Sequence, residues 1–277
     1  MRTILRMLAA ISLAAALPGW AEGIAFLSNL KGDVAVDGNA RPILLAELSR
    51  GAKLVLGREA QASVMFVSSG KEYALKGPGE FLVKDTEIAA SSGMPPMTRE
   101  TAWRASSKVL TQAAQTSAAS VRMRSIALAK PDTEARLLFP TQGNIATLQP
   151  TFRWRAADAK AQGEFVLLVA GQEKPVHTAK AANGAYRVPA RLLPDTDYVW
   201  AVSVAGDEIG TGRFRTLPAD AVAQVEQRRP KEKADFSDRV LFTLMLQEMG
   251  ATQEAHESWS RLAQERTDLP ELTSFAR

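Results

Sequence analysis

The sequence predicts a mainly β fold with two β domains, a connecting helix and a C-terminal helical hairpin. Short apolar runs separated by glycine-containing turns cover residues 24–90, and a second such series covers residues 131–217. Two other segments, 98–118 and 235–263, repeat apolar residues with helical spacing. The length of 277 residues accommodates two domains of ordinary size. The expected divisions are a signal peptide at 1–21, a first β domain at 22–96, a helix and linker at 97–130, a sandwich at 131–218, and a linker with a helical hairpin at 219–277.

The composition excludes several kinds of functional site. The chain has no cysteine, which rules out disulfides, thiolate metal sites and a cysteine nucleophile. It has only two histidines, His177 and His256, so a three-histidine zinc site cannot form. Basic residues are scattered among acidic ones instead of forming a clustered face, so nucleic-acid binding is not expected.

The first 21 residues are typical of a secretory signal peptide. A basic start is followed by Met7–Leu17, an apolar run of 11 residues, and Gly19–Ala21 places small residues at a cleavage site. An uncleaved anchor is the alternative, but a membrane helix needs about 20 apolar residues. Cleavage after Ala21 lowers the net charge from +4 to +2, because the removed segment carries two arginines and no acidic residue. We therefore expect a periplasmic protein that does not span the membrane once the signal is removed.

The first β domain contains short strands joined by tight turns. Asp37–Asn39 and Ser68–Gly70 are good turn sequences, because glycine and asparagine tolerate the positive φ that tight hairpins need. The second of these turns predicts a hairpin between its flanking strands. The expected strands are Ile24–Leu27, Asp33–Val36, Lys53–Leu56, Ala62–Val67, Tyr73–Lys76 and Phe81–Val83.

Glycines and apolar residues recur with a particular spacing in this domain. The motifs are Gly32-Asp33-Val34, Leu48-x-x-Gly51-x-x-Leu54, Ala62-x-Val64-x-Phe66, Gly70 and Leu75-x-Gly77-Pro78-Gly79. With this pattern, residues 24–93 resemble the FecR-like domain of bacterial envelope proteins. The resemblance implies a small β domain in the periplasm. FecR-type sigma regulators carry a cytoplasmic segment and a membrane helix before this domain. Here six residues precede the apolar run, so direct control of a sigma factor is not expected.

Residues 97–130 are predicted to form a helix and a linker. Thr98 can cap a helix N-terminus, and Glu100 suits its first turn near the positive end of the helix dipole. Apolar residues then recur along one face, with Trp103 as the expected anchor. We expect a helix from Thr98 to about Ala118 that packs against a β domain; a partner-binding helix is the alternative.

The second β domain has the strand spacing of a β-sandwich. Gly210–Gly212 is expected to separate its last two strands, and the loop Ala181–Ala185 would contact a partner if it forms an exposed hairpin tip. The expected strands are Thr151–Arg155, Glu164–Val169, Tyr198–Val204 and Arg213–Thr216.

Three motifs relate this domain to a known family. They are Pro150-x-Phe152-x-Trp154, Leu193-Pro194-Asp195-Thr196-Asp197-Tyr198-x-Trp200-x-Val202, and Gly212-x-Phe214-x-Thr216. Residues 137–217 thereby resemble a fibronectin type III or related immunoglobulin-like domain. The resemblance implies a tyrosine corner, in which the Tyr198 hydroxyl bonds a backbone group upstream. It implies no particular ligand, because such sandwiches host many functions.

The remaining residues are predicted to form a linker and a helical hairpin. Pro218–Ala234 is polar, and its basic run Arg228–Lys233 is interpreted as solvated linker, with a binding patch as the alternative. The helices are expected to begin near Asp235 or Ser237 and near Thr252, with Gly250 ending the first. We expect the hairpin to pack on the preceding sandwich. Its spacing also resembles half of one tetratricopeptide motif, but a solenoid needs at least three copies.

No constellation of catalytic residues is recognisable. The chain lacks a nucleophile elbow, a phosphate loop and an H-E-x-x-H motif. His177 and His256 are interpreted as surface or edge residues, and Asp195 and Asp197 as turn residues. We therefore predict no catalytic, cofactor-binding or metal-binding residues, and no enzymatic activity. The tryptophans expected in the core are Trp103, Trp154, Trp200 and Trp259, which leaves no visible platform for a sugar.

These observations predict a non-enzymatic periplasmic FecR-domain protein that mediates protein–protein interaction in envelope signalling or assembly. The expected partner is another envelope protein. Binding of peptidoglycan or another polysaccharide is the alternative, because FecR-like domains often occur beside modules that bind the cell wall. No cofactor is expected.

Overall fold

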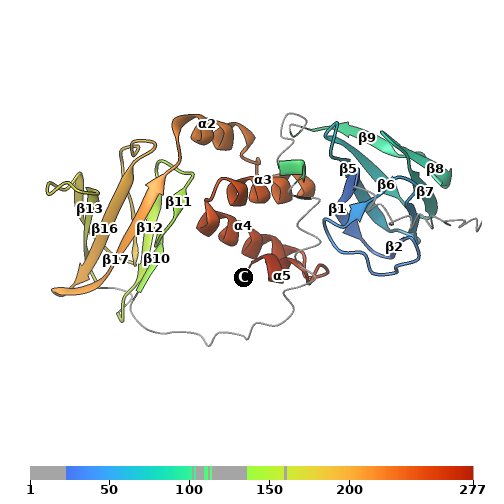
Figure 1. Ribbon diagram of the computed structural model, residues 1–277. Helices are drawn as coiled ribbons and strands as arrows, with labels where there is room; N and C mark the ends of the chain where they lie inside the picture. The colour runs from blue at the N-terminus through green and yellow to red at the C-terminus, as the bar shows by residue number, and fades with distance from the viewer. Residues whose placement is uncertain are drawn as a thin grey trace, which may run out of the picture.

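The computed structural model describes residues 23–101, 103, 109–111, 113, 136–158 and 161–276 (Figure 1). The expected signal peptide lies outside these residues. As the sequence predicts, the fold is mainly β, with sheets at both ends and helices near the C-terminus. The two β modules lie on opposite sides of the helices, so the molecule is elongated (Figure 1).

The first β module consists of two sheets packed face to face. One has the strand order β3-β1-β5-β6-β9 and the other the order β2-β4-β7-β8. All six expected strands are present, with bounds that differ by a few residues, and β5 and β6 form the expected hairpin. The first sheet contains β1 (Ala25–Lys31), β3 (Glu47–Leu48), β5 (Gln61–Phe66), β6 (Lys71–Lys76) and β9 (Met97–Glu100). The second contains β2 (Val34–Val36), β4 (Lys53–Leu56), β7 (Gly79–Val83) and β8 (Ile88–Ser92).

The Gly77-Pro78-Gly79 motif is explained by a close approach of two chain segments. A Cβ atom on Gly77 would lie 2.0 Å from the carbonyl oxygen of Gly57, so no side chain fits there. The backbone N–H of Gly77 also donates to the Ala60 carbonyl at 2.8 Å. Glycine is therefore needed at this position for the strands to meet.

The helix predicted from Thr98 does not begin there. Met97–Glu100 form strand β9, which pairs with β6, and Thr98 lies opposite Tyr73. The polar residues of this segment suit an edge strand, and Arg99 forms an ion pair with Glu72 on β6. The pairing with β6 and the ion pair therefore favour a strand here over the helix that Thr98 and Glu100 would otherwise begin. Residues 109–111 and 113 are helical, and residues 102, 104–108, 112 and 114–118 of the predicted helix lie outside the described residues. Trp103 is buried, as expected for an anchor.

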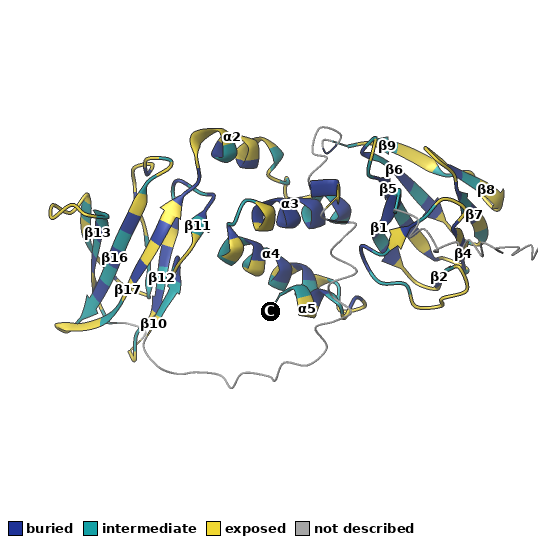
Figure 2. Cartoon of the chain, in the orientation of Figure 1, coloured by how far each residue is buried: buried dark blue, intermediate teal, exposed yellow. Residues whose placement is uncertain are grey.

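The second β module is a sandwich of two sheets, as predicted. Their strand orders are β10-β12-β15 and β11-β17-β16-β13-β14. The first sheet contains β10 (Arg136–Phe139), β12 (Thr151–Arg155) and β15 (Ala185–Arg187). The second contains β11 (Asn144–Ile145), β13 (Gly163–Val169), β14 (His177–Ala181), β16 (Asp197–Val204) and β17 (Asp207–Thr216). Alternate residues of these strands point into the core between the sheets (Figure 2).

Two predictions about this module are wrong. Gly210–Gly212 does not separate strands but lies within β17, because Gly212 packs against Trp200, whose Nε1 lies 2.4 Å from where a Cβ would stand. Ala181–Ala185 is not a hairpin tip. The strand before it, β14, pairs with β13, whereas the strand after it, β15, pairs with β12. The segment therefore crosses from one sheet to the other.

The tyrosine corner is present. The backbone N–H of Leu193 donates to the Tyr198 hydroxyl at 3.0 Å, and the Tyr198 ring is buried against Phe214 at 5.4 Å between centroids. This contact ties the loop before β16 to the core of the sandwich.

The helical part contains one helix more than predicted. Ala219–Arg228, expected within a polar linker, form α2, in which Val222 and Val225 are buried one turn apart. The two expected hairpin helices are α3 (Phe236–Glu248) and α4 (Thr252–Glu265), followed by the short α5 (Leu272–Phe275). Gly250 between α3 and α4 has a φ of +77°, as expected for a residue that ends a helix.

The hairpin was predicted to pack on the sandwich, but the helices contact both β modules. Helix α3 is buried on nearly all sides, which requires partners on more than one face (Figure 2). Its apolar residues belong to the same core as those of the first β module. Arg266, after α4, donates to the Asn29 side chain at 2.8 Å, and Glu271 accepts from the Leu44 N–H at 2.7 Å.

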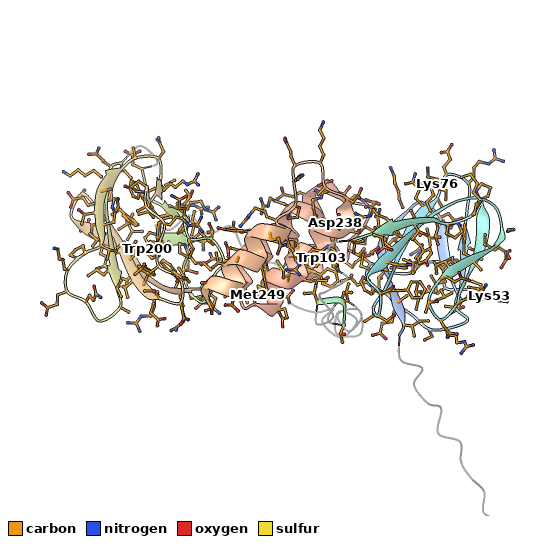
Figure 3. All side chains as sticks on the ribbon, turned by 90° about the horizontal axis from the view of Figure 1, so that it is seen from above. Lys53, Lys76, Trp103, Trp200, Asp238 and Met249 are labelled. Carbon is orange, nitrogen blue, oxygen red and sulfur yellow. The ribbon has the colours of Figure 1, made fainter. Side chains whose placement is uncertain are left out.

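A polar network joins the first β module to α3. The guanidinium of Arg99 donates to Glu72 at 2.8 Å and to Asp238 at 2.7 Å. Glu72 is buried and also accepts from the Ser28 hydroxyl at 2.6 Å. Asp238 accepts from the Trp103 indole at 3.1 Å (both labelled in Figure 3). Burial lowers the pKa of Arg99, but its bonds to Asp238 and Glu72 outweigh this and raise the pKa above the usual range.

We predict that Arg99→Met lowers the free energy of unfolding by about 3–5 kcal/mol, because the buried Glu72 carboxylate loses its counter-charge. Chemical denaturation of the purified mature chain measures this. The double variant Arg99→Met/Glu72→Gln should recover part of the loss, because it removes the unpaired charge. A single variant as stable as wild type would show that the network does not join the modules.

We also predict that Tyr198→Phe lowers the stability of the sandwich by about 1–3 kcal/mol, because the Leu193 N–H loses its acceptor while the ring stays in place. Hydrogen exchange resolved by segment measures this, with faster exchange expected in β16 and β17. Strand β5 in the first module is the internal control and should not change. Unchanged exchange in the sandwich would mean that the hydroxyl contributes nothing to its stability.

Candidate functional site

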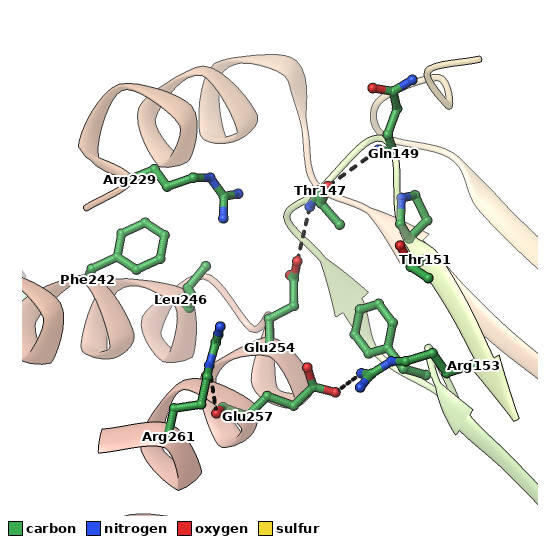
Figure 4. Close-up of a pocket in the computed structure, with 12 residues that line it drawn as sticks. Thr147, Gln149, Thr151, Arg153, Arg229, Phe242, Leu246, Glu254, Glu257 and Arg261 are labelled. Carbon is green, nitrogen blue, oxygen red and sulfur yellow. Dashed lines mark hydrogen bonds and ion pairs between the residues drawn. The ribbon is translucent and has the colours of Figure 1, made fainter. Parts of the chain in front are cut away.

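A cleft lies where the sandwich meets the helices (Figure 4). Its volume is about 290 Å³, and a second cavity of similar volume adjoins it along the helices. Both cavities are lined by Arg229, Phe242 and Arg261, so they form two lobes of one cleft. We call this region the arginine cleft. The other residues that line its first lobe are Phe139, Thr147, Gln149, Pro150, Thr151, Arg153, Leu246, Glu254 and Glu257.

Three elements position the charged side chains of the arginine cleft. Arg153 lies on β12, between the buried Phe152 and Trp154, so it points away from the core of the sandwich. Arg229 directly follows the last residue of α2. Arg261 lies on α4, four residues after Glu257, so both occupy one helix face.

Glu254 holds the sandwich against the first turn of α4. Its carboxylate oxygens accept the backbone N–H groups of Ala146 and, at 3.2 Å, of Thr147 (Figure 4). Burial raises the pKa of Glu254, and this effect outweighs the N–H donors and the nearby Arg229, which lower it. The neighbouring Gln253 accepts from the Thr141 N–H at 2.9 Å. Both residues therefore hold the sandwich against helix α4.

The arginines of the cleft differ in how their charge is compensated. Arg153 forms an ion pair with Glu257 and lies 5.1 Å from the Phe139 ring. Arg229 lies 5.7 Å over the Phe242 ring, and Arg261 bonds the backbone carbonyl of Glu257 at 3.3 Å. Neither of these two forms an ion pair with a carboxylate of the described residues. The cleft is therefore positively charged around Arg229 and Arg261.

The two histidines lie outside the arginine cleft. His177 begins β14, where its Nε2 is hydrogen-bonded to the Tyr186 hydroxyl and the two rings stack at 5.4 Å. His256 is exposed on α4. Within the described ranges, three or more histidine or acidic side chains do not gather in a way that could hold a metal ion. Asp195 and Asp197 both form ion pairs with Arg215, at 2.9 and 2.7 Å.

The four tryptophans that the sequence places in the core are all buried there. Trp103, Trp154, Trp200 and Trp259 are each exposed by 3% or less. None of them can offer a flat face to a sugar from solvent.

The arginine cleft is the feature that sequence reasoning missed. The basic run Arg228–Lys233 was interpreted as solvated linker, but Arg229 and Lys231 line the cleft. The spacing of Val222 and Val225 carried a signal for a short helix in this segment, but it does not predict that the basic run lies against the hairpin. Glu254 and Glu257 carried no distinct signal, since acidic residues on an exposed helix face are common.

We predict that wild type loses stability relative to Glu254→Gln as pH rises above about 4.5, the ordinary pKa of this group. The folded pKa is raised, so the contribution of Glu254 is fully present below the unfolded pKa and is lost as pH rises through the folded one. Each unit of pKa shift corresponds to about 1.4 kcal/mol. Denaturation of both proteins between pH 4 and 8 measures the difference, with the exposed Glu248→Gln as control. The opposite slope would show that the N–H groups stabilise the charged form more than burial opposes it.

The comparisons with known proteins identify no family. No protein-family model matches the chain, and a search of curated proteins finds no match. Among the helices of the described residues, none combines the length and the apolar character of a membrane span. The likeness to FecR-like and fibronectin type III domains accordingly rests on the motifs quoted from the sequence.

Proposed function

We propose that this protein is a non-enzymatic adaptor of the bacterial cell envelope, located in the periplasm, that binds another envelope protein in signalling or assembly. The observation that carries the proposal is the joint between the modules. One helical hairpin is bonded to the first β module through Arg99 and Arg266 and to the sandwich through Glu254. Two modules held at a fixed separation offer a partner a long, preorganised surface, which lowers the entropic cost of binding.

The surfaces available for recognition support the same proposal. Strand β14 ends one sheet of the sandwich, and β8 ends one sheet of the first module. Strand β8 lies at the end of the molecule far from the helices (Figure 1). Backbone groups at such edges can pair with a strand of another protein, and they need no special side chains to do so.

We expect capture of a partner to be independent of both histidines and of metal. The experiment immobilises the mature protein and measures enrichment of proteins from a periplasmic extract by mass spectrometry. His177→Ala, His256→Ala and added chelator should leave the enrichment unchanged, because neither side chain belongs to a catalytic or metal-binding group. Circular dichroism confirms that each variant is folded.

Two outcomes would contradict this proposal. Loss of capture in a folded histidine variant, or with chelator, would reveal a metal or acid–base site that the proposal excludes. Sedimentation with purified sacculi in the absence of any captured protein would instead support peptidoglycan binding, the alternative function.

A further inference from the structure

The arginine cleft has the shape of an extended binding groove. Its two lobes meet at Phe242, and each has a volume of about 290 Å³. Phe242 and Leu246 lie one turn apart on α3, and Leu262 lies on α4 in the second lobe. These side chains are almost fully buried, with 3–7% of each exposed, so they form the apolar floor of the cleft. A small inorganic ion would fill only part of one lobe, whereas a short extended segment would contact both.

The cleft contains more positive than paired negative charge, which favours an anionic ligand. The carboxylates of its first lobe are already occupied, Glu254 by backbone N–H groups and Glu257 by Arg153. In the second lobe, Arg239 is paired with Glu265 through two bonds. Arg229, Lys231 and Arg261 form no ion pair within the described part of the chain. Among the described residues no carboxylate is in direct contact with these three cations, although Arg229 is close enough to Glu254 to lower its pKa.

The arrangement of Arg229 favours a carboxylate ligand. Its guanidinium carbon lies 5.7 Å from the centre of the Phe242 ring, and the Arg229 side chain is exposed. A guanidinium binds a carboxylate through two parallel hydrogen bonds, which gives both strength and orientation. Apolar side chains next to such a carboxylate would find Phe242 and Leu246 beside them.

We propose that the arginine cleft binds an acidic peptide segment in which carboxylate and apolar side chains alternate, presented by the partner protein. This inference rests on the proposed adaptor function and adds the chemistry by which the partner is recognised. Arg229 and Arg261 bind the carboxylates, and Phe242 with Leu246 contacts the apolar side chains. Because the cationic groups are exposed at the mouth of the cleft, they also steer an acidic segment toward it.

The test uses a fluorescein-labelled hexapeptide of alternating glutamate and leucine, titrated with the mature protein and followed by fluorescence anisotropy. Arg229→Gln/Arg261→Gln should weaken binding by about tenfold or more, because each arginine makes charge-assisted hydrogen bonds. The matched control is Arg58→Gln/Arg213→Gln, which removes the same charge from exposed arginines outside the cleft and should bind like wild type. A peptide of alternating glutamine and leucine should bind weakly to all three proteins.

Three results would overturn the inference. The cleft double variant could bind the acidic peptide like wild type, or the glutamine peptide could bind as tightly as the glutamate peptide. Inorganic phosphate could also displace the peptide at equal concentration, which would mark a site for small anions instead.

Partner capture separates failure of this inference from failure of the adaptor function. If wild type and Arg229→Gln/Arg261→Gln capture the same partner equally, the adaptor function stands and the inference about the cleft is wrong. If wild type captures no partner, the adaptor function itself is wrong.

Discussion

The arrangement of this molecule depends on one partly buried ionic contact, the bonds of Arg99 to Glu72 and Asp238. Glu72 belongs to β6 and Asp238 to α3, so a single guanidinium joins a sheet to a helix from a distant part of the sequence. A buried charge is costly unless it has its partners, and here the buried Glu72 carboxylate also accepts from Ser28, while the Asp238 carboxylate accepts from Trp103. Together with the shared apolar core and the bonds of Arg266 and Glu271, this contact holds the hairpin on the first β module.

Several consequences follow from this fixed position of the hairpin. Helix α3 can be apolar on nearly all sides because it is covered by the first module, by α2 and by α4. Helix α4 then presents its N-terminal turn to the sandwich, where Gln253 and Glu254 accept backbone N–H groups that have no partner in a sheet. The sandwich is thereby held through its loops, through Arg153 on β12 and through β11, whereas β14 lies at the opposite edge of the sheet that contains β11.

The sequence predicted correctly the secondary structure that depends on a local residue pattern. Its predictions were wrong where contacts between distant parts of the chain determine the structure. The strands with alternating apolar residues, the tyrosine corner at Tyr198 and the end of α3 at Gly250 all depend on residues close together in the sequence. The structure contains all three. Thr98 carries a helix-capping signal, yet its segment pairs with β6, a choice made by an edge about 25 residues earlier in the sequence. Gly212 was interpreted as a turn residue because its tight contact with Trp200 is invisible in a pattern of residue types.

The candidate site was missed for a related reason. A basic run predicts solvated chain when it is considered alone, and only the position of α2 brings Arg229 over Phe242. The carboxylates are equally ambiguous in the sequence. Glu257 and Arg261 have the spacing of a stabilising helical ion pair, but the Glu257 carboxylate instead forms its ion pair with Arg153 of the sandwich. Arg261 is left with a backbone carbonyl as its partner.

This competition connects the joint to the electrostatics of the arginine cleft. While the sandwich is docked, Glu257 is paired with Arg153, and Glu254 accepts the backbone N–H groups of Ala146 and Thr147. Neither carboxylate therefore forms an ion pair with Arg261 or Arg229. If the sandwich moved away, Glu257 would be free to pair with Arg261 one turn further along α4. The positive charge of the cleft is therefore a property of the assembled molecule and not of the helical hairpin alone. Recognition of an acidic segment would in turn favour the docked arrangement, because binding stabilises whichever state presents the unpaired arginines.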